Sequence, residues 1–283
     1  MTAVWYAVMS MVFAAGNDLL FKFFSRRERS CGLFCAVIGA VSVAYCLLTL
    51  THLPSDWRAT VIWGSVAGFF SIAGNLLLIG AMKKLSAGVC STIYRLNLVP
   101  TVLGAWLLLG ENLSIMQWLG AALAVAAVLA FIPKKGSGRE EFSWVCFIMV
   151  ICGAFMRAAM GLCYRYGFSH GADREFVTLI TCFFWVLGGA VWYFLTEYKK
   201  VKPDWKTVNY GVLSGVLVTG ILVFMTLSLQ YGNAAVVLPI AQMSFLLTGA
   251  AGIVFLKEKF TIRTAAAFVC GCGAVLVLSI FSS

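Results

Sequence analysis

Arg95 lies in the middle of an otherwise apolar run, with Tyr94 and Asn97 beside it. Ionisable and amide side chains are costly to hold in a hydrocarbon layer, so they usually face a cavity or a partner. Gln242 and Ser244 stand 147 residues after Arg95 and Asn97, within a second apolar run. A guanidinium with amides and hydroxyls at one level offers charge-assisted hydrogen bonds to an anionic group. We therefore predict that these five residues line one binding site for a small polar molecule.

Three further polar residues lie within apolar runs. Arg157 and Asn75 are predicted to line the same cavity. The alternative is an internal pairing of Arg95 or Arg157 with Asp18 or with backbone carbonyls. Asp18 is the only carboxylate inside an apolar run, and it is a candidate proton acceptor because burial disfavours the charged form of a carboxylate. Its alternative is a pair with Lys22, one helical turn away.

The charges in these runs give a weak preference about the bound molecule. Two arginines against one carboxylate make a slightly positive cavity, which favours an anionic or zwitterionic compound. A permanent cation should instead prefer an excess of carboxylates and aromatic rings.

The composition indicates a protein that lies in a membrane. Apolar residues make up 61% of the 283 residues and charged residues 11%, with a mean hydropathy of +0.94. Soluble domains have about 45–50% and about 25%, respectively. The net charge of +10 does not indicate nucleic acid, because the basic residues stand in short loops between apolar runs. No nucleic-acid partner is expected, and the bilayer is the expected surroundings.

Metal, cofactor and enzyme chemistry have little support. The ten cysteines form no CxxC pair and lack companion ligands at metal spacing, so we expect them to pack as small apolar residues. The two histidines, His52 and His170, fall in separate loops, and no glycine-rich phosphate motif or nucleophile elbow is present. We expect no metal, no cofactor and no catalytic constellation.

Ten apolar runs divide the chain, and each is about 20 residues long, enough to cross a ~30 Å hydrocarbon layer as a helix. They lie near 3–24, 31–50, 59–81, 86–109, 114–133, 142–164, 175–196, 208–230, 234–256 and 263–281. The fold class predicted is an all-α integral membrane protein with ten transmembrane helices.

Lys and Arg are distributed unevenly between the two sets of loops. Loops after odd-numbered runs hold most of them, whereas loops after even-numbered runs hold only Arg58, Arg165 and Arg174. Because basic loops stay on the cytoplasmic side, the odd loops are predicted to be cytoplasmic and both termini to lie outside. The expected location is the cell (inner) membrane.

The two halves of the chain repeat each other. Residues 1–135 hold five runs and residues 142–283 hold five more, and where one half has a basic loop the other has a nearly neutral one. A shift of 147 pairs Gly64-x3-Gly68 with Gly211-x3-Gly215, and a shift of 143 pairs the ends of the first run of each half. Since five is odd, the second half must begin on the opposite side, which predicts a 5+5 inverted-topology repeat of the kind found in secondary transporters.

A motif at the end of the fourth run carries a family resemblance. Pro100 is followed by a Leu-rich stretch ending in Gly110-Glu111, and then by Gln117 and Gly120. The chain resembles the drug/metabolite transporter superfamily in its ten-helix form with two EamA domains, over nearly its whole length. Known members export amino acids, drugs or other metabolites, or exchange phosphorylated compounds, so the resemblance implies that range without choosing among them.

Four residues are markers of this resemblance. Pro100 and Pro239 are expected to bend the fourth and ninth helices beside the cavity, where freed carbonyls can find new partners. Glu111 and Glu258, at equivalent helix ends, are expected to be structural, because a carboxylate there favours the positive end of the next helix.

The function predicted is secondary active transport of a small polar metabolite, such as an amino acid, a carboxylate or a phosphorylated compound. Two halves would rock about a midplane site to alternate access. Alternatives are an exporter of drugs or amphipathic cations, and a non-transporting membrane subunit that handles lipid-linked sugars. A membrane enzyme or a channel would need features that the sequence lacks. The residues do not choose between a monomer and a homodimer.

Overall fold

The computed structural model describes residues 2–24, 27–81, 94–130, 144–201, 203–244, 246–247, 250 and 262–281. Every regular element in these residues is helical, and they contain no strand. The helices are α1 (Thr2–Phe24), α2 (Cys31–Thr49), α3 (Trp57–Ala81), α5 (Leu98–Leu108), α6 (Ile115–Ala130), α7 (Trp144–Ser169), α8 (Arg174–Trp192), η1 (Tyr193–Glu197), α9 (Trp205–Tyr231), α10 (Ala234–Gln242) and α12 (Ile262–Ile280). This confirms the all-helical prediction.

The helices form from the apolar runs and begin at polar caps. Ser30, Asp173 and Asp204 start α2, α8 and α9, and each accepts a hydrogen bond from a backbone N–H of the first turn. Six described helices are long and apolar enough to cross a membrane: α1, α2, α3, α7, α8 together with η1, and α9. The other four predicted runs contain residues or side chains outside the described part of the chain.

Two pairs of glycines make the same contact in each half. α3 packs on α8 through one pair, and α9 packs on α2 through the equivalent pair 147 residues later. The contacts are Gly64 with Ile180, Gly68 with Phe184, Gly211 with Val37 and Gly215 with Val41. A Cβ added at any of these glycines would lie 3.0 Å or less from the facing side chain, so the helices need glycine to approach this closely. The facing residues correspond as well, by a shift of 143. Such reciprocal contacts relate the first and second halves by a pseudo-two-fold axis.

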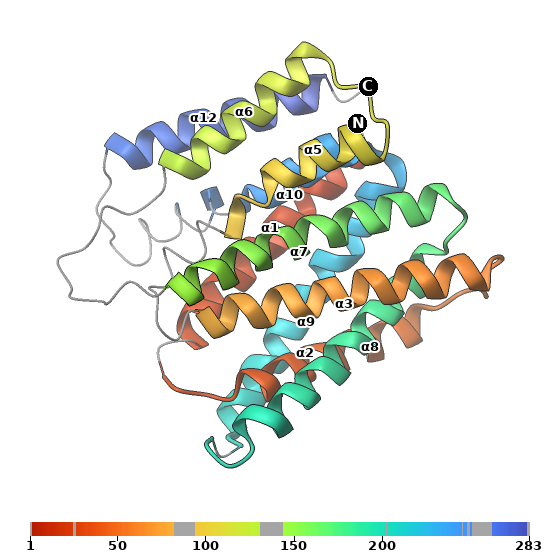
Figure 1. Cartoon of the computed structure of the whole chain (residues 1–283), viewed down its shortest axis with the longest axis vertical. Helices are drawn as coiled ribbons and strands as arrows, with labels where there is room; N and C mark the ends of the chain where they lie inside the picture. Colours follow the sequence, from red (N-terminus) through yellow and green to blue (C-terminus); the bar gives the residue numbers. More distant parts are fainter. Residues whose placement is uncertain are drawn as a thin grey trace.

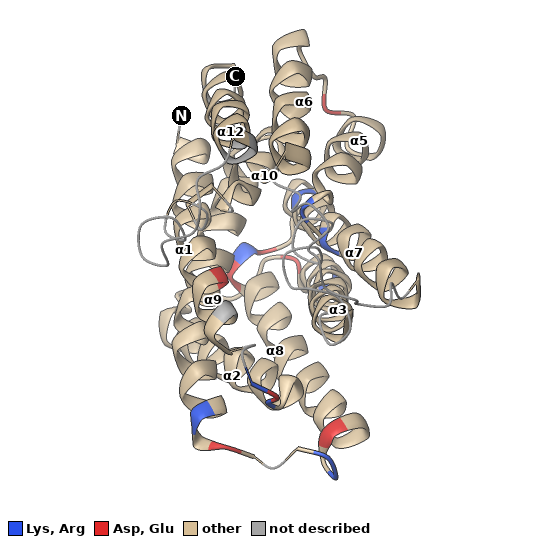
Figure 2. Cartoon of the chain, turned by 90° about the vertical axis from the view of Figure 1, so that its left-hand side faces the viewer, with Lys and Arg blue, Asp and Glu red and all other residues tan. Residues whose placement is uncertain are grey.

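The other helix contacts follow the same exchange of partners. α1 packs on α9 as α7 packs on α3, while α2 with α8 and α6 with α12 pair directly with their equivalents. α6 and α12 lie side by side at one edge, with α5 and α10 next to them (Figure 1). The N- and C-termini lie near each other in both views (Figures 1 and 2).

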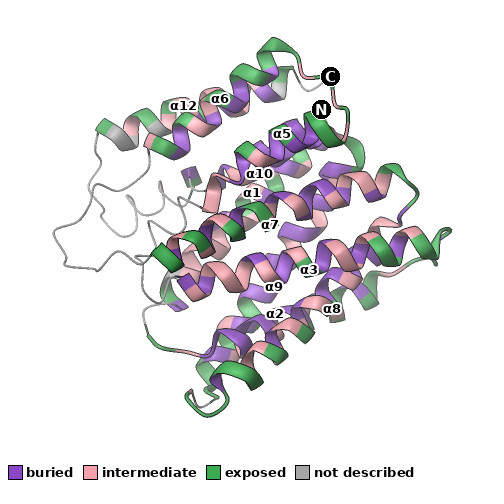
Figure 3. Cartoon of the chain, in the orientation of Figure 1, coloured by how far each residue is buried: buried purple, intermediate pink, exposed green. Residues whose placement is uncertain are grey.

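Burial follows from this arrangement. α10 is enclosed along its length, with every residue from Ala234 to Ala241 buried. Buried residues gather where the helices meet at the centre, and exposed ones at the helix ends and outer sides (Figure 3). The outer sides expose large apolar side chains such as Leu48, Leu108 and Phe194. Large exposed apolar surface is what a bilayer would cover. Charged residues occupy little of the helices (Figure 2).

Candidate functional site

The helical backbone that holds Tyr94 and Arg95 is interrupted just before α5. Asn97 N–H bonds to Tyr94 O (3.2 Å) and Val99 N–H to Leu96 O (3.0 Å), so the chain turns more tightly here than in an α-helix. Pro100 explains the interruption, because it has no N–H to donate and its ring clashes with the carbonyl four residues earlier, that of Leu96. The helix begins again as α5.

The helical backbone is interrupted at the equivalent position of the second half, at the end of α10. α10 ends at Gln242; Met243 N–H bonds to Ile240 O (3.0 Å) and Leu246 N–H bonds to Met243 O (3.0 Å). Met243 stands 147 residues after Leu96, the offset that relates the two halves. Two broken helices therefore meet across the pseudo-two-fold axis, and in transporters such breaks are where backbone groups become available to ligands.

Arg95 links three segments at these interruptions. Its Nη1 donates to the Gln242 carbonyl oxygen (2.9 Å) and to Ser244 Oγ (2.8 Å). Its Nη2 forms an ion pair with Asp18 Oδ2, and Ser244 Oγ donates to the same carboxylate oxygen (3.2 Å). The guanidinium is thus held by a carboxylate, a carbonyl freed at a helix end and a hydroxyl. Its side chain is 13% exposed, against 34% for the carboxylate.

Asp18 lies on the inner face of α1. Trp5, Met9 and Val12 mark the exposed face of that helix, and Asp18 lies well away from them at helical spacing. The structure therefore shows an ion pair between Asp18 and Arg95. This pair was the alternative to Arg95 as a residue that lines the cavity. The side chain of Lys22 lies outside the described residues.

Tyr94 and Asn97 leave polar atoms buried without a partner in the described structure. Asn97 is 1% exposed, and neither its amide nitrogen nor its amide oxygen has a hydrogen bond; the same holds for the Tyr94 hydroxyl. The Tyr94 side chain packs against Gly74 and Gly153, at the point where α3 and α7 cross and their backbones approach closely. A buried unsatisfied polar group costs about 1–3 kcal/mol, so such a set needs an explanation.

Arg157 lies near this set on α7. Its side of the helix is opposite to the exposed Ile148 and Phe155. Its Nη1 approaches Met160 Sδ (3.8 Å), a weak acceptor, and among the described residues it has no carboxylate partner. Gly153, one helical turn before Arg157 on α7, lies against the Tyr94 ring. The described residues around Tyr94 therefore include two guanidinium groups, of Arg95 and Arg157, and one carboxylate, of Asp18.

Three of the predicted residues make contacts that differ from the predicted lining of a cavity by their side chains. Gln242 contributes its backbone carbonyl to Arg95, in place of its side chain. Ser244 contacts Arg95, whereas the repeat placed it opposite Asn97. The amide of Asn75 donates to a carbonyl of its own helix (2.8 Å), and no hydrogen bond in the described residues joins it to Arg95.

Glu111 caps a helix of the other half. Its carboxylate accepts from the backbone N–H groups of Ala234 (2.9 Å) and Ala235 (3.0 Å), and from Arg165 Nε (3.3 Å). Gly110, with φ of 64°, ends α5 in the left-handed conformation and turns the chain so that Glu111 reaches α10. The carboxylate therefore stabilises the positive end of α10, and not that of the next helix along the chain, α6.

The remaining family markers differ in position. Pro100 follows the interruption at Leu96, whereas Pro239 lies inside α10, before the interruption at Met243. Glu258 lies outside the described residues.

A second glutamate, Glu197, also caps a helix and is not among the predicted site residues. Glu197 is 2% exposed and accepts from Ser30 Oγ (2.7 Å), the N–H groups of Cys31 (3.3 Å) and Gly32 (3.0 Å), and Trp192 Nε1 (3.3 Å). Glu197 lies in the second half of the chain and accepts hydrogen bonds from backbone N–H groups in the first turn of α2, which belongs to the first half. A lone glutamate at the end of an apolar run reads as a solvated loop charge, so the sequence carried no signal for this role.

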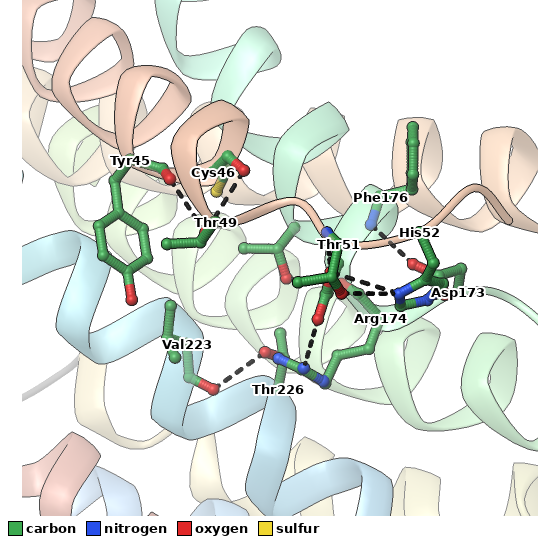
Figure 4. Close-up of polar contacts among 12 residues, drawn as sticks. Tyr45, Cys46, Thr49, Thr51, His52, Asp173, Arg174, Phe176, Val223 and Thr226 are labelled. Atoms are coloured by element: carbon green, nitrogen blue, oxygen red, sulfur yellow. Dashed lines mark hydrogen bonds and ion pairs between the residues drawn. The ribbon is translucent and has the colours of Figure 1, made fainter.

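A polar cluster joins two loops at the end of α2 and the start of α8, opposite to the helix ends where Glu197 lies (Figure 4). His52 Nε2 lies 2.7 Å from Asp173 Oδ2 and His52 Nδ1 lies 3.7 Å from Glu175 Oε2. Asp173 also caps α8 by accepting from Phe176 N–H (3.0 Å). No cluster of His, Cys, Asp and Glu in the described residues is arranged to hold a metal ion. This cluster fastens the loop between α2 and α3 to the start of α8.

Comparisons with known proteins agree with this fold. A model of the EamA-like transporter family matches residues 1–132 and 144–280. A solved structure described only as a crystal structure of protein superposes with a TM-score of 0.80 at 16% identity, over 99% of this chain and 97% of that one. At that identity the likeness shows the fold alone. A search among curated proteins finds no match.

Proposed function

Because the chain belongs to the EamA-like transporter family, we propose that it is a secondary transporter of a small anionic or zwitterionic metabolite. An amino acid, a carboxylate or a phosphorylated compound fits this description. The observation that carries the proposal is the arrangement around Arg95, which joins α1 to two helix interruptions through a carboxylate, a carbonyl and a hydroxyl. Members of the family are membrane transporters, which favours transport over enzyme chemistry.

The architecture proposed is ten spans in two inverted halves, in the cell (inner) membrane. The reciprocal glycine contacts of α3 on α8 and α9 on α2 support two halves related by a two-fold axis. With five spans in each half, that axis must lie in the membrane plane. The positions of Lys and Arg place both termini outside.

The orientation predicts the result of a reporter fusion. A reporter attached to the C-terminus should be active only if it functions on the outer side, because the even-numbered spans end there. Paired reporters that function on opposite sides, fused at the same position, measure this directly. Activity of the cytoplasmic reporter alone would contradict the orientation and leave the fold untouched.

Transport in this proposal depends on competition for Arg95. In the structure its guanidinium is occupied by Asp18, the Gln242 carbonyl and Ser244 Oγ. A substrate carboxylate or phosphate offers the same charge-assisted hydrogen bonds and can replace Asp18. Because Arg95 joins elements of both halves, exchanging its partner changes the relative stability of two arrangements of the halves. A ligand shifts such an equilibrium only by its differential affinity for the two arrangements.

Asp18 is proposed as the proton acceptor that couples this exchange to a proton gradient. Protonation removes its negative charge and so weakens its pairing with Arg95, which leaves the guanidinium available to an anion. Its side chain is 34% exposed on the inner face of α1, so a proton can reach it while the pair is formed. Substrate and proton would then enter together on one side and leave together on the other.

The substrate class follows from the unpaired groups around Arg95. Asn97 and Tyr94 have buried polar atoms without partners, and Arg157 has no carboxylate partner in the described structure. A bound metabolite with an anionic group and a hydrogen-bonding group would satisfy all three. Two guanidiniums disfavour a cationic substrate, because like charges in a low-dielectric site repel strongly.

Substitution of Arg157 tests this assignment. We expect Arg157→Gln to raise the substrate concentration for half-maximal uptake by about tenfold or more, since a charged hydrogen bond contributes about 1.5–3 kcal/mol. Uptake into vesicles would be measured with labelled amino acids, carboxylates, phosphorylated metabolites and organic cations. Arg58→Gln, at an exposed position near the start of α3, is the matched control. Unchanged affinity in Arg157→Gln, or uptake of cations only, would contradict the assignment.

A further inference from the structure

A groove with basic walls lies between the end of α1 and the start of α9. It has a volume of about 530 Å³, and its polar walls come from Arg27, Arg29, Lys206 and Asn209. It lies at the helix ends, away from Arg95 and outside the transport site. The α9 side is the first turn of a helix, where the helix dipole adds positive character.

One of the cations in this groove is held in place without a carboxylate. Arg29 Nη1 donates to Phe24 O (2.5 Å), and its guanidinium lies 5.0 Å from the centre of the Tyr210 ring. Ion pairs among the described residues do not include Arg27, Arg29 or Lys206. A guanidinium positioned by a carbonyl and an aromatic face keeps donors free for an anion.

Two carboxylates stand near these cations, and one of them is already engaged. A smaller adjoining hollow of about 210 Å³ is lined by Glu28 and Asp204 together with the same basic residues. Asp204 Oδ1 accepts from Lys206 N–H (3.2 Å) as the cap of α9. Positive charges therefore outnumber negative ones around the groove.

The remaining walls of the groove are apolar and face outward. Phe23 and Leu213 line it and are both exposed. Val216, one turn beyond Leu213 on α9, continues this exposed apolar surface, and Trp205 is exposed at the helix start. Exposed Trp is typical of the boundary between hydrocarbon and headgroups. The cations thus lie at the level of headgroups, and the apolar walls lead toward the acyl chains.

We propose that this groove binds an anionic phospholipid. Its phosphate contacts Arg27, Arg29 and Lys206, Asn209 hydrogen-bonds the headgroup, and the acyl chains run along α1 and α9 from Phe23 and Leu213. A free phosphate would use the cations but not the apolar walls. Basic pockets between transmembrane helices are suited to such headgroups. Because α1 and α9 belong to different halves, the bound lipid would also hold the two halves together at this end.

The test compares two pairs of substitutions that remove the same charge. The double substitution Arg27→Gln and Lys206→Gln removes two positively charged side chains from the walls of the groove. It leaves Arg29 and its packing intact. Lys199→Gln with Lys200→Gln, at exposed positions after η1, is the control. Binding to the purified full chain in neutral detergent would be measured by native mass spectrometry and by thermal stabilisation. The probes are phosphatidylglycerol, phosphatidylcholine, glycerol phosphate and inorganic phosphate.

We expect phosphatidylglycerol to bind and stabilise the wild type and the control pair, and phosphatidylcholine to do neither. The groove pair should bind phosphatidylglycerol roughly thirtyfold more weakly. Equal loss in both pairs would show a non-specific charge effect and overturn the proposal. Equal stabilisation by glycerol phosphate or inorganic phosphate would overturn it in favour of a soluble anion. Melting of the lipid-free variants separates loss of binding from loss of fold.

Discussion

Replacement of Arg95 by alanine is expected to lower transport at least about a hundredfold and to destabilise the protein. The transport loss follows because, in the proposed mechanism, substrate and Asp18 compete for the guanidinium, and about 3 kcal/mol of lost charged contacts corresponds to a hundredfold. The stability loss follows because Asp18 would lose its cation inside the membrane. We expect on the order of 2 kcal/mol, below the 3–5 kcal/mol typical of buried pairs, because Asp18 is 34% exposed.

A double substitution separates these two effects. Arg95→Gln with Asp18→Asn removes both charges and keeps polar side chains that can bond to each other and to Ser244. We expect this variant to regain most of the thermal stability lost in Arg95→Ala, since neutral replacements for an ion pair are often nearly as stable. We expect no recovery of transport. Full transport in the double variant would rule out a role for the guanidinium in substrate binding.

The single variant Asp18→Asn tests whether Asp18 carries the coupling proton. If Asp18 carries the coupling proton, uptake by this variant should no longer respond to a pH gradient, while exchange of labelled for unlabelled substrate at equal pH continues. Uptake and exchange in the same vesicle preparation supply both measurements. A gradient response equal to that of the wild type would remove Asp18 from coupling and leave Arg95 as the substrate contact.

The repeat accounts for much of what could be predicted from the sequence. The offset of 147 residues brings Gly64 and Gly211, and likewise Gly68 and Gly215, to equivalent crossings. These features depend on regular helices, in which spacing along the chain sets position in space. The family assignment is confirmed by the match over residues 1–132 and 144–280.

The contacts at the site depend on irregular backbone, which spacing does not describe. Gln242 acts through its carbonyl because the helix breaks at Met243, and a regular helix would have used that carbonyl internally. Ser244 meets Arg95 for the same reason, since the break turns it out of helical register. Proline marks one break, at Pro100, but the other has no such marker beside it. Tertiary packing decides where that helix ends.

The two capping glutamates show a second limit. Glu111 could be identified as structural from its place at a helix end, but its partner is α10, far away in sequence. Glu197 had no distinguishing pattern at all. A cap within one helix has a fixed spacing, as at Ser30, whereas a cap supplied from another segment has none.

Glu111→Ala is expected to destabilise the protein by about 3 kcal/mol and to reduce transport severely. Its carboxylate receives two backbone N–H bonds from the first turn of α10 and one bond from Arg165, and its side chain is 7% exposed. Removing it leaves two buried donors and a cation without their partner, a change that typically costs 3–5 kcal/mol. α10 carries the Gln242 carbonyl that binds Arg95, so loosening its start displaces the site at its end.

Two control variants distinguish this cap from a general charge effect. Glu111→Gln keeps an oxygen acceptor for one N–H group, so we expect roughly half the loss of the alanine variant. Glu28→Gln removes an exposed carboxylate and should change stability by no more than about 0.5 kcal/mol. Unfolding in detergent measures stability, and uptake measured well below the melting temperature reports the site. If Glu111→Ala melted as the wild type does, α10 would not depend on the cap, and the proposed coupling between the start of α10 and Arg95 would be contradicted.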